Sequence, residues 1–285
     1  MSRTDEYNIN LLPNELQYQI LDELSLEELR RVFFSIEDPH VRAYASELGK
    51  RFIYWSNTSV KQLAREGDLQ GVQWLHAQGA DILHLYVIRN ALDGAAFSGN
   101  LEVVKWLYNQ GADILDTYNI IRAALIGNLE LVQWLHAQGA DILHPYVINS
   151  AAESGNLELV KWLHAQGADI SDPGVIEHAA ESGNLELVKW LHAQGADILD
   201  RYVIEYAAKS GNLELVKWLY AQGADILDRD VIEYAAKSGN LELVKWLYAR
   251  GANISDPMVI TLATASAAQS GNFELVDWLT NRGVR

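Results

Sequence analysis

One phrase recurs through this 285-residue chain at almost fixed intervals. It reads SGNLELVKWLHAQGADILD at residues 182–200 and SGNLELVKWLYAQGADILD at residues 210–228. Each copy contains a Gly-Asn pair (Gly-Asp in the first copy), and a tryptophan follows seven residues after the glycine. These glycines lie 32, then five times 28, then 32 residues apart: Gly67, Gly99, Gly127, Gly155, Gly183, Gly211, Gly239 and Gly271. Periods of this length indicate an array of small units that stack on their neighbours.

Each unit is predicted to contain two helices separated by a glycine. In the copy at residues 200–226, Asp200 suits the N-cap of a first helix, and Asn212 suits the N-cap of a second. Gly211 interrupts the chain between them, and Gly223 suits a left-handed C-terminal cap. The second helix is apolar around most of its circumference, so neighbouring units must cover it. The two longer steps add four residues, about one helical turn, inside the first helix.

Composition and charge exclude several functions. The absence of cysteine excludes disulfides, thiolate catalysis and cysteine-based zinc sites. A formal net charge of −16 opposes binding to a phosphate backbone. No apolar run is long enough to cross a bilayer, and the first residues lack the apolar core of a secretory signal. No nucleophile–base pair, phosphate-binding loop or metal motif stands out. We therefore expect a cytoplasmic monomer with no catalytic residue, metal or cofactor, binding neither nucleic acid nor membrane.

Two repeated positions have side chains that could suggest a site. Four histidines share one of them: His76, His136, His164 and His192. Neighbouring stacked helices lie about 8–10 Å apart, which is too far for two imidazoles to ligate one metal ion. We therefore interpret these histidines as exposed helix residues and the repeated tryptophans as core.

The segment GNLELVKWLHAQGADI resembles the second helix and following loop of ankyrin repeats, and VIEYAA stands where those repeats have their first helix. The resemblance covers residues 57–285 in about eight repeats and implies an all-α solenoid. Ankyrin repeats usually have about 33 residues and a Thr-Pro-Leu-His motif. Here the step is 28 and the motif is absent.

The missing residues fall where ankyrin repeats project a β-hairpin finger. We therefore expect short turns there, with partner contacts shifted toward the helices. Short repeats with a tryptophan in the second helix resemble the ankyrin arrays of giant viruses.

Residues 1–56 are assigned to a separate helical segment and connector. Within it, LLPNELQYQILDELSLEELRRVFF at residues 11–34 resembles an F-box, with Pro13 opening one helix and a capping box at Ser25 and Glu28 opening another. F-boxes bind the Skp adaptor of cullin-RING ubiquitin ligases. The resemblance implies that the adaptor-binding residues are Leu12, Pro13, Leu16, Ile20, Leu21, Leu24, Leu29 and Val32. The alternative is that these helices only cap the apolar face of the first repeat.

One position just before the inter-helix glycine varies while its surroundings hardly change. In ankyrin arrays, residues at this position line the concave side. The series runs from apolar to acidic to basic, and Ile126 enlarges its apolar end. We predict a partner groove formed by Phe97, Leu125, Ile126, Glu153, Glu181, Lys209 and Lys237, with the apolar residues as anchor and the charges setting register. The alternative is sequence drift on a solvated edge.

These observations favour a non-enzymatic protein–protein interaction module. The leading hypothesis is a substrate-recognition adaptor that links a target on its concave face to a Skp–cullin ubiquitin ligase. The alternative is an ankyrin binding scaffold with no ubiquitin link, whose N-terminal helices act only as a cap. If the protein is viral, we expect it in the host cytoplasm.

Overall fold

The structure is a computed structural model that describes residue 21 and residues 39–98, 101–252, 260–262, 264–265, 268 and 273–282. Throughout this part of the chain the regular elements are α-helices joined by short turns, and no β-strand is present. The chain divides into two compact units, Met1–Ile114 and Leu115–Arg285. The domain boundary predicted after residue 56 falls inside the first unit and stays a prediction.

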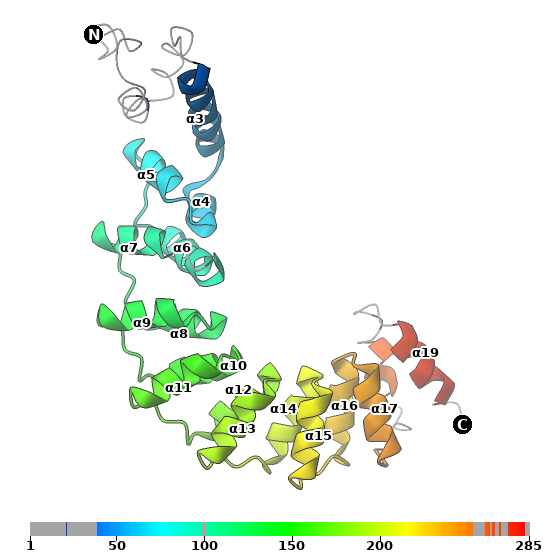
Figure 1. Cartoon of the computed structure of the whole chain (residues 1–285). Coiled ribbons are helices and arrows are strands. Elements are labelled where there is room, and N and C mark those ends of the chain that lie inside the picture. Colours follow the sequence, from blue (N-terminus) through cyan, green and yellow to red (C-terminus); the bar gives the residue numbers. More distant parts are fainter. Residues whose placement is uncertain are drawn as a thin grey trace, which may run out of the picture. The chain divides into compact units, whose positions relative to one another are not determined.

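Within the first unit, α3 (Pro39–Asn57) is followed by two helix pairs. The pairs are α4 (Val60–Glu66) with α5 (Leu69–Ala77), and α6 (Leu85–Ser98) with α7 (Glu102–Asn109). Helix α4 packs on α6, α5 packs on α7, and α3 packs on α5 (Figure 1). Helix α6 has 14 residues, whereas the first helices of the second unit have nine or ten. This confirms that the first of the longer steps lengthens a first helix.

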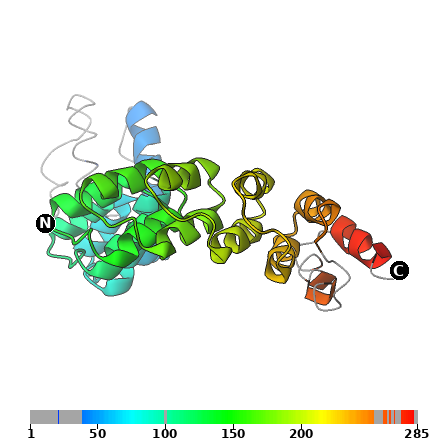
Figure 2. The same ribbon diagram turned by 90° about the horizontal axis from the view of Figure 1, so that it is seen from below.

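The helices of the second unit whose bounds the structure describes are five further pairs and α19 (Phe273–Arg282). The first helices of the pairs are α8 (Thr117–Ile126), α10 (Pro145–Glu153), α12 (Pro173–Ser182), α14 (Arg201–Ser210) and α16 (Arg229–Lys237). The second helices are α9 (Leu129–Ala137), α11 (Leu157–Ala165), α13 (Leu185–Ala193), α15 (Leu213–Ala221) and α17 (Leu241–Ala249). From α8 to α16, neighbouring first helices pack on one another, and each packs on its own second helix. Figure 2 shows the pairs of this unit from a second direction.

Local capping chemistry explains where these helices begin and end. The side chain of Asp200 accepts a hydrogen bond from the backbone N–H of Tyr202 at 2.9 Å, which starts α14. Gly211 and Gly223 have φ values of 75° and 106°, in the left-handed region where a side chain is strained. The predicted caps at Asp200, Asn212 and Gly223 are therefore confirmed.

In four repeats of the second unit, the asparagine that caps the second helix also ties its repeat to the one before. In Asn212, Oδ1 accepts from the N–H of Leu215 at 3.1 Å, and Nδ2 donates to the carbonyl of Gly183 at 2.7 Å. Because an amide carries both an acceptor and a donor, one side chain serves both purposes. The inter-repeat bond recurs from Asn156 to Gly127, from Asn184 to Gly155 and from Asn240 to Gly211.

The repeated tryptophans are half-buried rather than fully buried in the core, which corrects the sequence interpretation. An aromatic residue of the preceding repeat covers the ring edge-on at Trp106, Trp162, Trp190, Trp218, Trp246 and Trp278. The ring centroids of His164 and Trp190 lie 5.8 Å apart at an interplanar angle of 73°. Tyr220 takes the place of the histidine against Trp246, at 5.6 Å. The predicted exposure of the histidine position is confirmed for His76, His136, His164 and His192.

Helix α3 stands where a preceding repeat would lie against the first one. Trp55 is buried, and its ring centroid lies 6.0 Å from that of Trp74, the contact that histidine or tyrosine makes in later repeats. Its Nε1–H donates to Oδ2 of Asp68 at 2.7 Å, while Oδ1 of Asp68 accepts from the N–H of Gly71 at 2.9 Å. An acidic cap fits here because the neighbour offers an N–H donor instead of a carbonyl.

Gly71 completes this adaptation of the first repeat. Later repeats have a buried leucine at its position, such as Leu131 and Leu159, or valine in the case of Val103. A Cβ atom on Gly71 would lie 2.7 Å from the indole ring of Trp55, so a side chain would displace α3. Asp68 and Gly71 therefore depart from the repeat in ways that admit this helix.

Candidate functional site

The residues of the predicted partner groove, which we call the ladder, lie at or near the C-terminal ends of the first helices. In the second unit, Leu125 and Ile126 end α8, and Leu125 is 40% exposed. Glu153 ends α10 and is exposed. Glu181, Lys209 and Lys237 occupy the same position on α12, α14 and α16. Phe97 lies in α6 of the first unit, but its side chain is outside the described residues.

Two charges of this ladder neutralise each other. The ammonium of Lys209 lies 2.5 Å from a carboxylate oxygen of Glu181 on the neighbouring first helix. That hydrogen bond is the main reason why the pKa of Lys209 is raised. Lys237 pairs with Glu233 of its own helix at 2.7 Å. Among the described residues Glu153 makes no ion pair, so it is the ladder charge left open to a partner.

Most of the F-box-like residues are outside the described part of the chain. This applies to Leu12, Pro13, Leu16, Ile20, Leu24, Leu29 and Val32. Leu21 is described, and it is helical and fully buried. Leu21 is therefore a poor choice for a variant that should disturb only an external contact.

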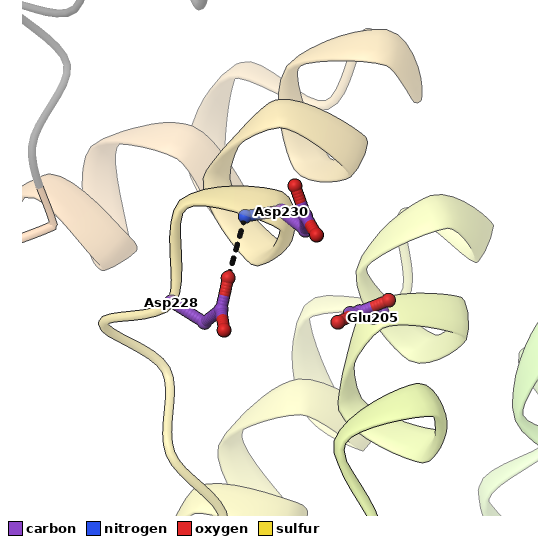
Figure 3. Close-up of side chains that lie close together, drawn as sticks. All are labelled: Glu205, Asp228 and Asp230. Carbon is purple, nitrogen blue, oxygen red and sulfur yellow. Dashed lines mark hydrogen bonds between the residues drawn. The ribbon is translucent and has the colours of Figure 1, made fainter.

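A group of carboxylates that sequence reasoning missed lies between α14 and α16. Figure 3 shows Glu205 on α14, and Asp228 and Asp230 at the start of α16. Their carboxylate oxygens lie within 4.8 Å of one another. The guanidinium of Arg201 lies 3.0 Å from Glu205 and 3.2 Å from Asp230, so this cation accounts for the cluster.

The cluster also perturbs its own members. Desolvation raises the pKa of the buried Glu205 carboxyl, while the charge of Arg201 acts in the opposite direction. Glu205 in turn raises the pKa of Arg201. The Arg201–Glu205 pair follows the i, i+4 spacing, but the approach of Asp230 depends on how neighbouring repeats stack. The sequence spacing could therefore have predicted the Arg201–Glu205 pair, but not its approach to Asp228 and Asp230.

The inter-repeat turns carry exposed apolar side chains that sequence reasoning also missed. Leu143, Leu199 and Leu227 are 54%, 55% and 56% exposed, although each follows a buried isoleucine. Tyr146 and Tyr202, three residues after two of these leucines, are also exposed. The connections between these repeats are short, as predicted, and they expose apolar side chains to solvent.

A cavity of about 410 Å³ lies between α3 and the start of the first repeat. Its lining includes Lys50, Arg51, Tyr54 and Gln70, and these groups bond to residues around them: Lys50 to Glu47, Arg51 to Gln70, and Tyr54 to Glu66. Within this lining no nucleophile lies beside a general base. Elsewhere, no helix in the described part of the chain is both long and apolar enough to span a membrane.

Comparison with known proteins agrees with the repeat geometry. A family described as ankyrin repeats (3 copies) matches residues 120–202, 148–230, 176–258 and 204–285, and one described as ankyrin repeats (many copies) matches residues 91–136. No curated protein matches the sequence.

Among solved structures, the chain is similar to the human ASB11 ankyrin repeat domain, with a TM-score of 0.40 and 20% identity. This similarity covers 70% of the present chain and 86% of the human one. The family matches together span residues 91–285, well over half of the sequence. The protein therefore belongs to the ankyrin-repeat family, whose arrays are protein–protein interaction modules.

Proposed function

We propose that this protein is a substrate-recognition adaptor: its N-terminal F-box-like residues bind a Skp-type adaptor, and its repeats hold a target protein. The observation that carries this proposal is the position of α3. Trp55 of this helix already covers Trp74 and bonds to Asp68, so the first repeat has a cap without residues 11–34. Residues 11–34 are then not required to cap the first repeat, which weakens the alternative that they act only as a cap and leaves them for another role.

The groove for the target would be centred on the start of the second unit. Leu125 and Ile126 supply the apolar anchor, and Glu153 on the next first helix supplies a charge without an ion pair. Glu181 and Lys209 neutralise each other, so they favour a polar but uncharged part of the partner.

Co-elution of the full chain with a Skp-type adaptor in size-exclusion chromatography tests the proposal. The wild-type chain should form a stoichiometric complex at a concentration of about 10 µM. Leu16→Asp should abolish the complex and leave the helical circular dichroism unchanged. Leu125→Asp, a matched change at an exposed leucine of the array, should keep it. No wild-type complex, or an equal complex with Leu16→Asp, would favour the binding scaffold without a ubiquitin link.

A further inference from the structure

The inter-repeat turns of the second unit form an apolar and acidic edge at the N-terminal ends of the first helices. We propose that this edge binds an extended protein segment that carries one apolar and one basic side chain in every three residues. Its apolar members are Leu143, Tyr146, Leu199, Tyr202 and Leu227, which we call the turn edge. Binding at the turn edge would not depend on adaptor binding by the F-box-like residues or on target binding at Leu125.

Folding does not require these leucines. The isoleucine before each one fills the core: Ile198 and Ile226 are both 2% exposed. In the turn of the intervening repeat, Ser171 occupies the leucine position and bonds to Asp169 through both its N–H and its hydroxyl. Leucine at the same position exposes an apolar side chain, which a bound segment would remove from water.

A fixed negative charge stands beside each exposed leucine. The carboxylates of Asp141, Asp197 and Asp225 each accept a hydrogen bond at 2.9 Å from the N–H of the leucine two residues later. The bond holds the carboxylate next to that leucine. These three aspartates are exposed, and they make no ion pair within the described residues. A segment that brings apolar and cationic side chains together would complement this edge, whereas an anionic partner would be repelled.

The chain itself provides an example of a cation bound at such a turn. The guanidinium of Arg201 lies 5.1 Å from the centre of the Tyr202 ring and pairs with Glu205 and Asp230. Tyrosine and carboxylate thus hold a basic side chain at this edge. Pro145 occupies the position of Arg201 in the repeat of Tyr146, so the exposed ring of Tyr146 has no such arginine beside it.

The spacing of the turns fits an extended segment. Neighbouring packed helices lie about 8–10 Å apart. Three residues of an extended chain span about 10 Å. A segment with an apolar side chain at every third position can therefore place one at each turn. Its register would be set at Leu199 and Tyr202, which share one turn, and at Leu227 on the next turn. The turn that contains Ser171 separates these residues from Leu143.

A designed peptide tests this inference on the full chain. The probe is a fluorescent peptide of about 15 residues with repeated Lys-Leu-Ser triplets, a spacing that matches the turns. Its controls replace lysine by glutamate or leucine by serine. We expect the Lys-Leu-Ser peptide to bind in fluorescence anisotropy, with affinity falling as salt rises, and neither control to bind.

The variants copy residues that the chain already has at equivalent positions, so they should fold. Leu199→Ser with Leu227→Ser copies Ser171 and should weaken binding at least about tenfold. Asp197→Asn with Asp225→Asn copies Asn253, retains the acceptor for the leucine N–H, and should weaken binding and reduce its salt dependence. Tyr220→His copies His192 on a second helix and should leave binding unchanged.

Two results of the peptide assay would overturn the proposal. One is the absence of saturable binding up to about 1 mM peptide. The other is equal binding by wild type and the Leu199→Ser, Leu227→Ser variant. Light scattering of the free chain tests a second copy as the occupant. A wild-type dimer that the same variant dissociates would replace the basic segment with self-association, whereas a monomer in both cases supports the proposal.

Discussion

Asn212→Asp replaces the side-chain NH2 group by a carboxylate oxygen at a residue that connects two repeats. The aspartate keeps the acceptor for the N–H of Leu215, and acidic and amide caps stabilise a helix start about equally. The Nδ2 donor to the Gly183 carbonyl at 2.7 Å is lost, and a carboxylate oxygen faces that carbonyl instead. A net hydrogen bond contributes about 0.5–1.5 kcal/mol, and an unsatisfied partly buried partner costs about 1–3 kcal/mol. Because the Gly183 carbonyl is left without its donor, the second figure applies, and we expect destabilisation by about 1–3 kcal/mol.

Urea unfolding followed by circular dichroism measures this change. Asn212→Ser is the matched control, because serine caps the helix without reaching back as a donor and without adding charge; it should cost about 1 kcal/mol. Asp68→Asn is the reciprocal exchange, and it should also destabilise because it places an N–H donor against Nε1–H of Trp55. Equal stability of Asn212→Asp and wild type, within about 0.3 kcal/mol, would refute the reasoning.

Three further predictions address single contacts. His164→Ala should lower stability by about 0.5–1.5 kcal/mol through loss of the edge contact on Trp190, whereas His164→Tyr should not; equal thermal unfolding of the two variants would contradict this. Gly94→Ala should cost at least about 1–3 kcal/mol, because its Cβ would lie 2.0 Å from the carbonyl oxygen of Arg65; an unchanged urea midpoint would show that α4 and α6 can separate freely. Desolvation and the charge of Asp200 raise the pKa of Glu177, so its ionisation destabilises the folded state as pH rises through the folded pKa. Glu177→Gln should therefore raise the melting temperature near pH 8 but not near pH 3. An equal shift at both pH values would exclude this cause.

Local chemistry made the helix boundaries predictable from the sequence. Asp200, Asn212 and Gly223 act through bonds or dihedral angles within a few residues, so their roles do not depend on how repeats stack. The second function of Asn212 could not be predicted in the same way. Its bond to Gly183 joins residues 29 positions apart and depends on the distance between repeats.

Surface features were harder to predict because burial changes within two residues at a turn. Ile198 and Leu199 are adjacent and both apolar, yet only the isoleucine enters the core. Pairing within the array also changed the ladder, since Lys209 is engaged by Glu181 rather than free for a partner. The groove residues themselves stay a prediction.

The role of α3 left a signal in the sequence that became interpretable only with the structure. Asp68 and Gly71 depart from the asparagine and leucine of later repeats. Each departure fits one property of Trp55: its N–H donor requires an acceptor, and its ring requires space.

Thermal unfolding of two variants tests the central claim that α3 seals the array and leaves the preceding residues for partner binding. Deletion of residues 1–38 keeps α3, whereas Trp55→Ala removes its contact with Trp74 and Asp68 and should cost about 3–5 kcal/mol. We predict that the deletion leaves the melting temperature of the array within about 1 °C of wild type and that Trp55→Ala lowers it by several degrees. A deletion that lowers the melting temperature as much as Trp55→Ala would contradict the account, because residues 1–38 would then be part of the cap.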